Sequence, residues 1–249
     1  MPAGGSAVAD ERFIGKEYRH RAQADYPGLV AEVKAMLERG LATLENFLEP
    51  GFLSELQKSI LPMAAKSYEG GTRRPLIGGA LEGTLFYEVT FSRFLTQLVN
   101  DLLAGCQIHI EPSDAYPVLN ILTGAGGQEQ VKSWHFDATY LTVAMPVIVP
   151  DPARQADGKF RIWPNVRPFS QNRLLDRIWW NLAKLDVVRR SVRNFAVSLV
   201  PGNLYFFYGF RCYHGVDELD PNELRAVCLM NYGGPLFDRL KGKRMRYRH

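Results

Sequence analysis

Two neighbouring side chains in this sequence have the types and spacing of metal ligands. His135 and Asp137 are two residues apart in the segment WHFDATYLTV. Residues i and i+2 of a strand project from the same face, so on a strand both side chains would point into one cavity. An imidazole nitrogen and a carboxylate oxygen are two of the three ligands of a facial metal site, which leaves three positions of an octahedral Fe(II) open. We therefore predict a metal site at His135 and Asp137.

The C-terminal half of the chain contains a third candidate ligand and a cation. His214 follows an aromatic, strand-like segment and a glycine loop, and Arg225 comes eleven residues later. Arg225 opens the apolar run AVCLM, which is typical of a strand that is buried on at least one side. A guanidinium donates two parallel hydrogen bonds to a carboxylate. We therefore predict His214 as the third metal ligand and Arg225 as the partner of a terminal carboxylate.

A His-x-Asp pair alone is a weak signal, because the chain has five histidines and His109 with Glu111 forms a second pair of this kind. His20, His109 and His249 are expected to be surface residues or satisfied core residues. Two histidines, a carboxylate and a distal arginine in this order are far more specific than the pair, so the metal site is placed at His135 and not at His109.

Residues 26–105 are predicted to be mainly helical. Residues 40–48 alternate like a short strand between two helical segments. The expected helices are residues 27–39, residues 91–105 and a segment opened by Pro50 and Gly51 and interrupted near Pro62.

Residues 106–235 have the pattern of a β-core. Six or more short segments rich in aromatic and β-branched residues are separated by Gly, Pro, Asp and Asn, which is typical of an antiparallel sandwich or barrel. One helix interrupts them at about residues 171–192, where apolar residues recur at helical spacing. Helices followed by strands indicate an α+β protein with helices packed outside a single β-core, so residues 1–249 are predicted to form one domain.

Composition favours a globular cytoplasmic protein. Residues 1–25 are expected to be loosely ordered, and residues 238–249 form a basic tail that contributes six Lys or Arg side chains to a net charge of only +4. No basic stripe interleaved with aromatics and no apolar run of membrane-spanning length is present, so neither a nucleic-acid nor a membrane partner is expected. Three cysteines without a CxxC motif fit a reducing compartment.

The ordered set His135-x-Asp137, His214 and Arg225 resembles the Fe(II)- and 2-oxoglutarate-dependent oxygenases. Residues 40–60 are similar to the strand-then-helix opening of prolyl-hydroxylase-like and phytanoyl-hydroxylase-like members, and the resemblance covers about residues 40–235. It implies a double-stranded β-helix, that is, a jelly-roll, cupin-like core with packed N-terminal helices.

The resemblance also implies roles for these residues. His135, Asp137 and His214 would hold Fe(II), and Arg225 would pair with the distal carboxylate of 2-oxoglutarate. O2 and 2-oxoglutarate are then co-substrates, and 2-oxoglutarate is converted to succinate while the substrate is oxidised. Halogenating members lack the carboxylate ligand, so the presence of Asp137 favours hydroxylation, desaturation or oxidative ring closure.

The sequence departs from the family pattern at one position beside the arginine. Many members have Ser or Thr two residues after it, whereas this chain has Val227. The second contact to the distal carboxylate is therefore expected from Tyr140 or Thr139, and Asn120 is the candidate for the keto-acid end. On a regular strand Trp134, Phe136 and Tyr140 would lie opposite the metal ligands and belong to the core.

A small-molecule substrate is favoured, for example a free amino acid or a natural-product intermediate, bound to a monomer or homodimer. Two segments beside the expected barrel mouth carry arginines that would anchor a substrate carboxylate, although solvated side chains are the simpler expectation. These candidates are Arg73, Arg74, Arg161 and Arg167.

Two alternatives remain at this stage. A cupin-like binding protein would have a structural metal or none, but it would not need Arg225 in addition to the three ligands. An oxygenase that modifies proteins or nucleic acids would need a long groove with basic or aromatic recognition residues outside the tail.

Overall fold

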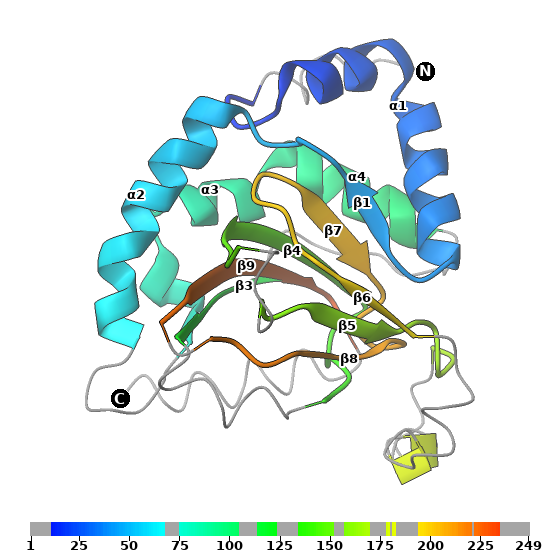
Figure 1. Ribbon diagram of the computed structural model, residues 1–249. Helices are drawn as coiled ribbons and strands as arrows, with labels where there is room; N and C mark the ends of the chain where they lie inside the picture. The colour runs from blue at the N-terminus through cyan, green and yellow to red at the C-terminus, as the bar shows by residue number, and fades with distance from the viewer. Residues whose placement is uncertain are drawn as a thin grey trace.

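The computed structural model describes residues 11–67, 75–104, 114–123, 134–151, 157–169, 178–179, 181–182, 194–220 and 222–234. Helices α1–α4 come before the main strands in the chain (Figure 1). They are α1 (Lys16–Glu38), α2 (Pro50–Ser67), the 3-10 helix η2 (Gly78–Leu81), α3 (Leu85–Thr90) and α4 (Arg93–Ala104). None of the described helices is long and apolar enough to span a membrane.

The described strands form two antiparallel sheets. The larger has the order β1-β7-β4-β9-β3-β2 and the smaller the order β6-β5-β8. The strands of the larger sheet are β1 (Ala42–Leu44), β2 (Leu76–Ile77), β3 (Ala115–Thr123), β4 (Leu141–Ile148), β7 (Leu204–Phe207) and β9 (Leu224–Tyr232). Those of the smaller sheet are β5 (Phe160–Trp163), β6 (Phe195–Val197) and β8 (Tyr213–Val216).

The helices cover the larger sheet, while the smaller sheet lies on the other side of it (Figure 1). Helix α1 contacts β1, α2 contacts β4 and α3 contacts β3. Strand β4 shows the consequence of this layering, because almost all of its residues are buried. Val143, Met145 and Val147 belong to the core, and Thr142 and Ala144 on the alternate face line a cavity. The predicted α+β architecture with helices packed on a β-core is confirmed.

The expectation of a loose N-terminus is wrong for residues 11–25. Helix α1 begins at Lys16, and Phe13 and Ile14 are 1% and 0% exposed. Within the helix, Tyr18 and Ala22 are four residues apart and both buried, on a face that the polar residues between them mask in the sequence. The predicted helix 27–39 is the second part of α1, which follows a kink at Asp25 where the Asp25 Oδ1 accepts a hydrogen bond from the Gly28 amide.

Other boundaries also differ from the expected ones. Helix α2 continues through Pro62 instead of ending there. The segment predicted as one helix over 91–105 is α4 alone, and the short α3 before it has Thr84 as its N-cap, whose hydroxyl accepts from the Tyr87 amide. Of the predicted helix 171–192, only residues 178–179 and 181–182 are described, and they are helical. Residues 1–10, the predicted first β-segment at 106–112 and the tail 238–249 lie outside the described residues.

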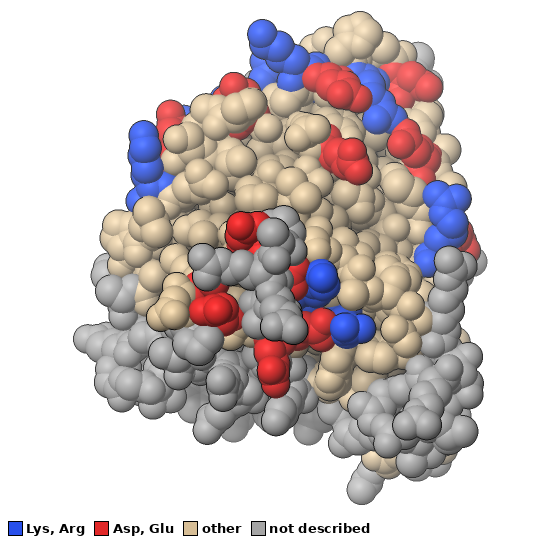
Figure 2. All heavy atoms as spheres, viewed as in Figure 1, with Lys and Arg blue, Asp and Glu red and all other residues tan. Residues whose placement is uncertain are grey.

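Charged side chains on the face shown in Figure 2 are of both signs and lie next to one another. Arg161 pairs with Asp217 at 2.6 Å, and Lys159 Nζ lies 3.7 Å from Asp157 Oδ2.

Cys212 and Cys228 are buried free thiols. Burial raises the pKa of Cys212 to about 12, so this thiol is held in its neutral form.

Candidate metal centre

His135 and His214 are joined through their backbones. The amide of each donates to the carbonyl of the other at 2.9 Å, which forms an isolated antiparallel bridge beside β8. Asp137 lies in irregular chain, where its amide donates to the Gly209 carbonyl at 2.9 Å. His135 and Asp137 line one cavity, as predicted, although the described residues 134–140 do not form the expected strand and only His135 has a strand-like partner.

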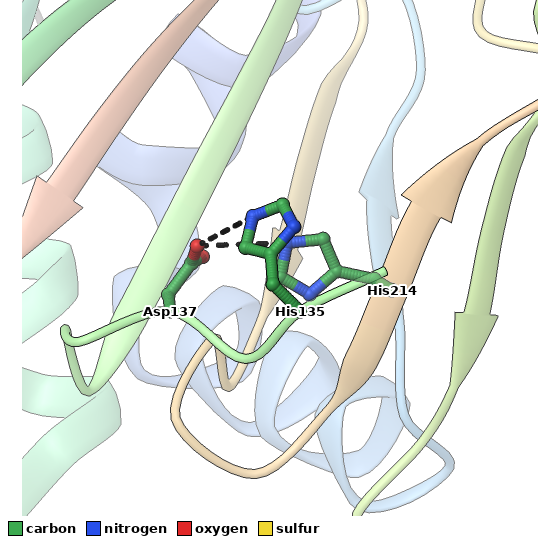
Figure 3. A group of neighbouring side chains, drawn as sticks. All are labelled: His135, Asp137 and His214. Atoms are coloured by element: carbon green, nitrogen blue, oxygen red, sulfur yellow. Dashed lines mark ion pairs between the residues drawn. The ribbon is translucent and has the colours of Figure 1, made fainter. Parts of the chain in front are cut away.

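The three side chains converge on one point (Figure 3). The Nε2 atoms of His135 and His214 each lie 3.5 Å from Asp137 Oδ1. One ligand atom from each residue lies within 4.8 Å of the other two. Neighbouring ligands of an octahedral ion are separated by about 3 Å, so two imidazole nitrogens and one carboxylate oxygen at these distances fit Fe(II).

The orientation of His214 is set by the main chain. Its Nδ1 lies 3.0 Å from the Cys212 carbonyl oxygen, which can only accept a hydrogen bond. Nδ1 therefore donates to this carbonyl, and Nε2 is the ring nitrogen that faces Asp137 and could bind a metal ion. His214 is buried, whereas the His135 side chain is 45% exposed, so the site opens on the His135 side.

The charge of Asp137 is stabilised by its neighbours. Burial alone would raise the pKa of this carboxyl, but the two histidines together hold it well below its usual range. The carboxylate is therefore available as a ligand at neutral pH.

The site opens into a cavity of about 130 Å³ between the two sheets. Its polar walls include Asn120 of β3, Thr142 of β4 and Arg225 of β9. Arg225 is only 3% exposed, and Gly158 lies against its stem, since a Cβ built there would be 3.4 Å from Arg225 Cδ. The Oδ1 of Asn120 is buried without a hydrogen-bond partner in the described structure. The rest of the lining is largely apolar, with Leu122, Ala144, Phe160, Phe207, Val227 and Leu229 among its residues.

Several predicted binding residues do not line this cavity. Tyr140 packs edge-on against Phe169 with ring centroids 5.7 Å apart, and Thr139 is hydrogen-bonded toward Asn231. Neither is placed to contact the co-substrate there. Residues 138–140 form a bend after Asp137, which turns both side chains away from the cavity.

The predicted substrate arginines are also engaged elsewhere or lie outside the described residues. Arg161 pairs with Asp217. Arg167 is neither solvated nor at the cavity: it is buried, donates from Nε to the Phe210 carbonyl and stacks over Phe136 and Phe210 at 4.2 and 3.8 Å. Arg73 and Arg74, like the pair His109 and Glu111, are outside the described residues.

The aromatic residues beside the ligands belong to the core, as predicted. Phe136 forms a small cluster with Trp163 and Tyr213, and Trp134 packs against it. A Cβ on Gly215 would lie 2.7 Å from Trp134 Cε3, so the strand that carries His214 needs glycine at this point.

Sequence reasoning missed the residues that support Asp137. Thr142 donates to Asp137 Oδ2 at 2.5 Å, and a Cβ on Gly209 would lie 2.5 Å from the same oxygen. A threonine five residues after the aspartate and a glycine in a distant loop have no distinctive pattern in one sequence.

No protein-family model and no curated protein sequence matches this chain. Solved structures do resemble it. A prolyl hydroxylase from Trichoplax adhaerens, in complex with a hypoxia inducible factor oxygen degradation domain peptide fragment, has a TM-score of 0.58 and 13% identity over 91% of this chain and 97% of that chain. EctD from S. alaskensis with bound Fe has a TM-score of 0.57 and 16% identity over 81% of this chain and 75% of that chain.

A third structure was solved with a metal ion and a co-substrate bound. The epimerase SnoN, in complex with Fe3+, alpha ketoglutarate and nogalamycin RO, has a TM-score of 0.55 and 14% identity over 84% of both chains. At these identities the resemblance shows the fold, and this chain has the double-stranded β-helix of these proteins.

Proposed function

We propose that this protein is an Fe(II)- and 2-oxoglutarate-dependent oxygenase that oxidises a small molecule. The observation that carries the proposal is the common cavity of the ligand cluster and Arg225. A metal-binding module would need only the three ligands. A buried guanidinium in the same cavity fits an anionic second ligand that reaches the metal.

His135, Asp137 and His214 would hold the ion. When bound, Fe(II) supplies the activation of O2 that no side chain can supply. The protein's own contribution is to bind and orient. Arg225 would receive the distal carboxylate of 2-oxoglutarate, and the largely apolar walls would exclude water from the reacting groups.

Asn120 would be the second polar contact to 2-oxoglutarate. It lies directly opposite Val227 in the β3–β9 pair, and Leu122 lies opposite Arg225. Along β9, Arg225 lies two residues before Val227. Asn231, which pairs with Thr142 beside Asp137, lies four residues after Val227. The register therefore favours a contact to the distal carboxylate over the keto-acid end, in place of the hydroxyl that position 227 lacks.

The substrate is proposed to be a free amino acid or a natural-product intermediate. An enclosed, mainly apolar cavity between two sheets supports a small molecule. Arg161 and Arg167 are occupied by other contacts, so Arg73 and Arg74 are the remaining arginine candidates for a substrate carboxylate. Hydroxylation, desaturation and ring closure all remain within the proposal.

The test is anaerobic Fe(II) titration of the purified protein together with assays of succinate formation. Wild type is expected to bind one Fe(II) per chain and to convert 2-oxoglutarate to succinate in the presence of O2. His135→Ala and His214→Ala should lose metal binding by much more than the roughly tenfold to hundredfold typical of residues that only support a ligand. Tyr140→Phe serves as the control, because Tyr140 is near the ligands in sequence but does not line the cavity.

Retained wild-type iron affinity in either histidine variant would contradict the assignment of the metal site. Metal binding without 2-oxoglutarate turnover under any substrate condition would favour the cupin-like binding protein instead.

A further inference from the structure

The two oxygens of Asp137 have different surroundings. Oδ1 lies 3.5 Å from the Nε2 atoms of both His135 and His214. Oδ2 accepts a hydrogen bond from Thr142 Oγ1 at 2.5 Å. One oxygen therefore faces the other ligands, and the second is engaged by the protein.

Thr142 is well placed to donate its single proton to this carboxylate. The residue is 1% exposed on β4. Asn231 Oδ1 at 3.4 Å and Thr139 Oγ1 at 3.5 Å are also within reach, but both are neutral and much farther away than Asp137 Oδ2. A charged acceptor at the shorter distance gives the stronger hydrogen bond, so the proton belongs to Asp137.

The side chain of Asn231 is oriented so that its oxygen faces Thr142. Its Nδ2 donates to the Tyr116 carbonyl at 3.2 Å, so its Oδ1 faces Thr142 and Thr139. The Asn231 Oδ1 atom can accept a hydrogen bond but cannot donate one, so the Thr142 hydroxyl cannot accept a hydrogen bond from Asn231. The contact spans two paired positions, since Thr142 lies opposite Asn231 in the β4–β9 register.

The loop at Gly209 closes the other side of the carboxylate. A Cβ at this position would meet both Thr142 Oγ1 and Asp137, at 2.5 Å from Oδ2. The Gly209 carbonyl also accepts from the Asp137 amide. The carboxylate therefore has little room to rotate about its own axis.

We infer that Thr142 is a positioning residue that keeps Asp137 a ligand through Oδ1 alone. By holding Oδ2 away from the metal, it would keep three coordination positions open for 2-oxoglutarate and O2, whereas a carboxylate bound through both oxygens would fill one of them. This inference rests on the proposed metal site. It assigns to Thr142 a contribution to metal affinity and coordination and no contact with substrate.

The experiment compares Thr142→Val with Thr142→Ser. Valine keeps the shape and loses the hydroxyl, whereas serine keeps the hydroxyl and loses the methyl group. We expect Thr142→Val to bind Fe(II) and Co(II) about tenfold to hundredfold more weakly than wild type, and to change the Co(II) ligand-field spectrum. Thr142→Ser should have near wild-type affinity and spectrum.

Thermal unfolding of the metal-free variants separates positioning from packing. A purely structural role would lower the melting temperature of both variants without a selective loss of metal binding. Wild-type metal affinity and spectrum in Thr142→Val, or equal losses in Thr142→Ser, would overturn the inference.

Failure of the proposed function has a different signature. If wild type binds Co(II) but does not turn over 2-oxoglutarate, the oxygenase proposal fails, and the two variants still decide the role of Thr142. If wild type binds no metal ion, both proposals are overturned.

Discussion

Arg225 is buried in the wall of the cavity that the metal ligands line, and its guanidinium is proposed to bind the distal carboxylate of 2-oxoglutarate. Arg225 lies on β9, which carries none of the candidate ligands, but it shares their cavity. Asn120 is its diagonal neighbour in the β3–β9 pair and lines the same cavity, and diagonal neighbours of an antiparallel pair are within reach of long side chains. The two residues are expected to act on the same end of the co-substrate.

We predict that Arg225→Ala raises the KM for 2-oxoglutarate by about one to two powers of ten, since a charge-assisted hydrogen bond contributes roughly 1.5–3 kcal/mol. Asn120→Leu should raise it less, by a few-fold to about tenfold, because a neutral hydrogen bond contributes roughly 0.5–1.5 kcal/mol. Fe(II) affinity should be unchanged in both. The measurements are 2-oxoglutarate titration of the Fe(II) protein and steady-state succinate formation.

Arg161→Ala is the matched control for this pair, because Arg161 pairs with Asp217 and does not line the cavity. If Arg161→Ala raised the KM as much as Arg225→Ala, the assignment of the co-substrate site would be wrong. An effect of Asn120→Leu on metal affinity rather than on 2-oxoglutarate would move that residue to the metal end.

At the scale of elements, the loop between β7 and β8 determines how closely the ligands can approach one another. Residues 208–212 bring Gly209 against the Asp137 carboxylate, and the Cys212 carbonyl orients His214. Arg167 stabilises this loop, because its Nε donates to the Phe210 carbonyl and its guanidinium stacks on the Phe210 ring. A short irregular segment thus positions two of the three ligands.

Gly209→Ala is expected to lower metal affinity more than protein stability. The added Cβ cannot fit without moving Asp137 or Thr142, and overpacking of this kind typically costs about 1–3 kcal/mol. Gly83→Ala is the control, since a Cβ there meets nothing within 4 Å although φ is +76°. Co(II) titration and urea unfolding of both variants would check this, and wild-type metal affinity in Gly209→Ala would contradict the close approach.

For the whole molecule, the segment just before α1 joins the helical layer to the sheet. Ile14 forms a bridge with Leu48, and the Phe13 carbonyl accepts from the Glu49 amide at the start of α2. Glu11 Oε1 accepts from the Arg93 amide at 2.8 Å at the start of α4. Phe13 itself packs against Phe47 and Phe52. Residues distant in sequence are therefore held together by a segment of a few residues.

Phe13→Ala is predicted to lower the free energy of unfolding by about 3–5 kcal/mol, the range for a large buried aromatic side chain. Leu61→Ala, at a position 53% exposed, should change it by less than about 0.5 kcal/mol. Metal affinity of the folded protein should be close to wild type in both, because neither residue lines the cavity. Denaturant unfolding measures the first effect, and a change below about 1 kcal/mol for Phe13→Ala would contradict the anchoring role of this segment.

Local patterns identified the candidate metal ligands and the type of each half of the chain. A ligand pair two residues apart, a distal histidine and an arginine at the head of an apolar strand are all features of short segments, and so they can be recognised without knowing the fold. The helical stripe of α4 and the strands of the second half can be recognised in the same way. In both, the spacing of the apolar residues indicates which face of the element is buried. The start of α1 shows the limit, since Tyr18 and Ala22 are only two buried positions among polar residues.

Only the tertiary structure decided which residues support those ligands. Thr142 meets Asp137 through a bend in the chain, Asn120 comes next to Arg225 through the register of β3 and β9, and Gly209 approaches from a loop seventy-two residues after Asp137 in the numbering of the chain. Arg167, which looked like a substrate anchor, is instead enclosed by two aromatic rings. Register and loop packing depend on the sum of many distant contacts, so a one-residue shift would exchange every inward side chain for its neighbour while leaving the local pattern of each segment unchanged.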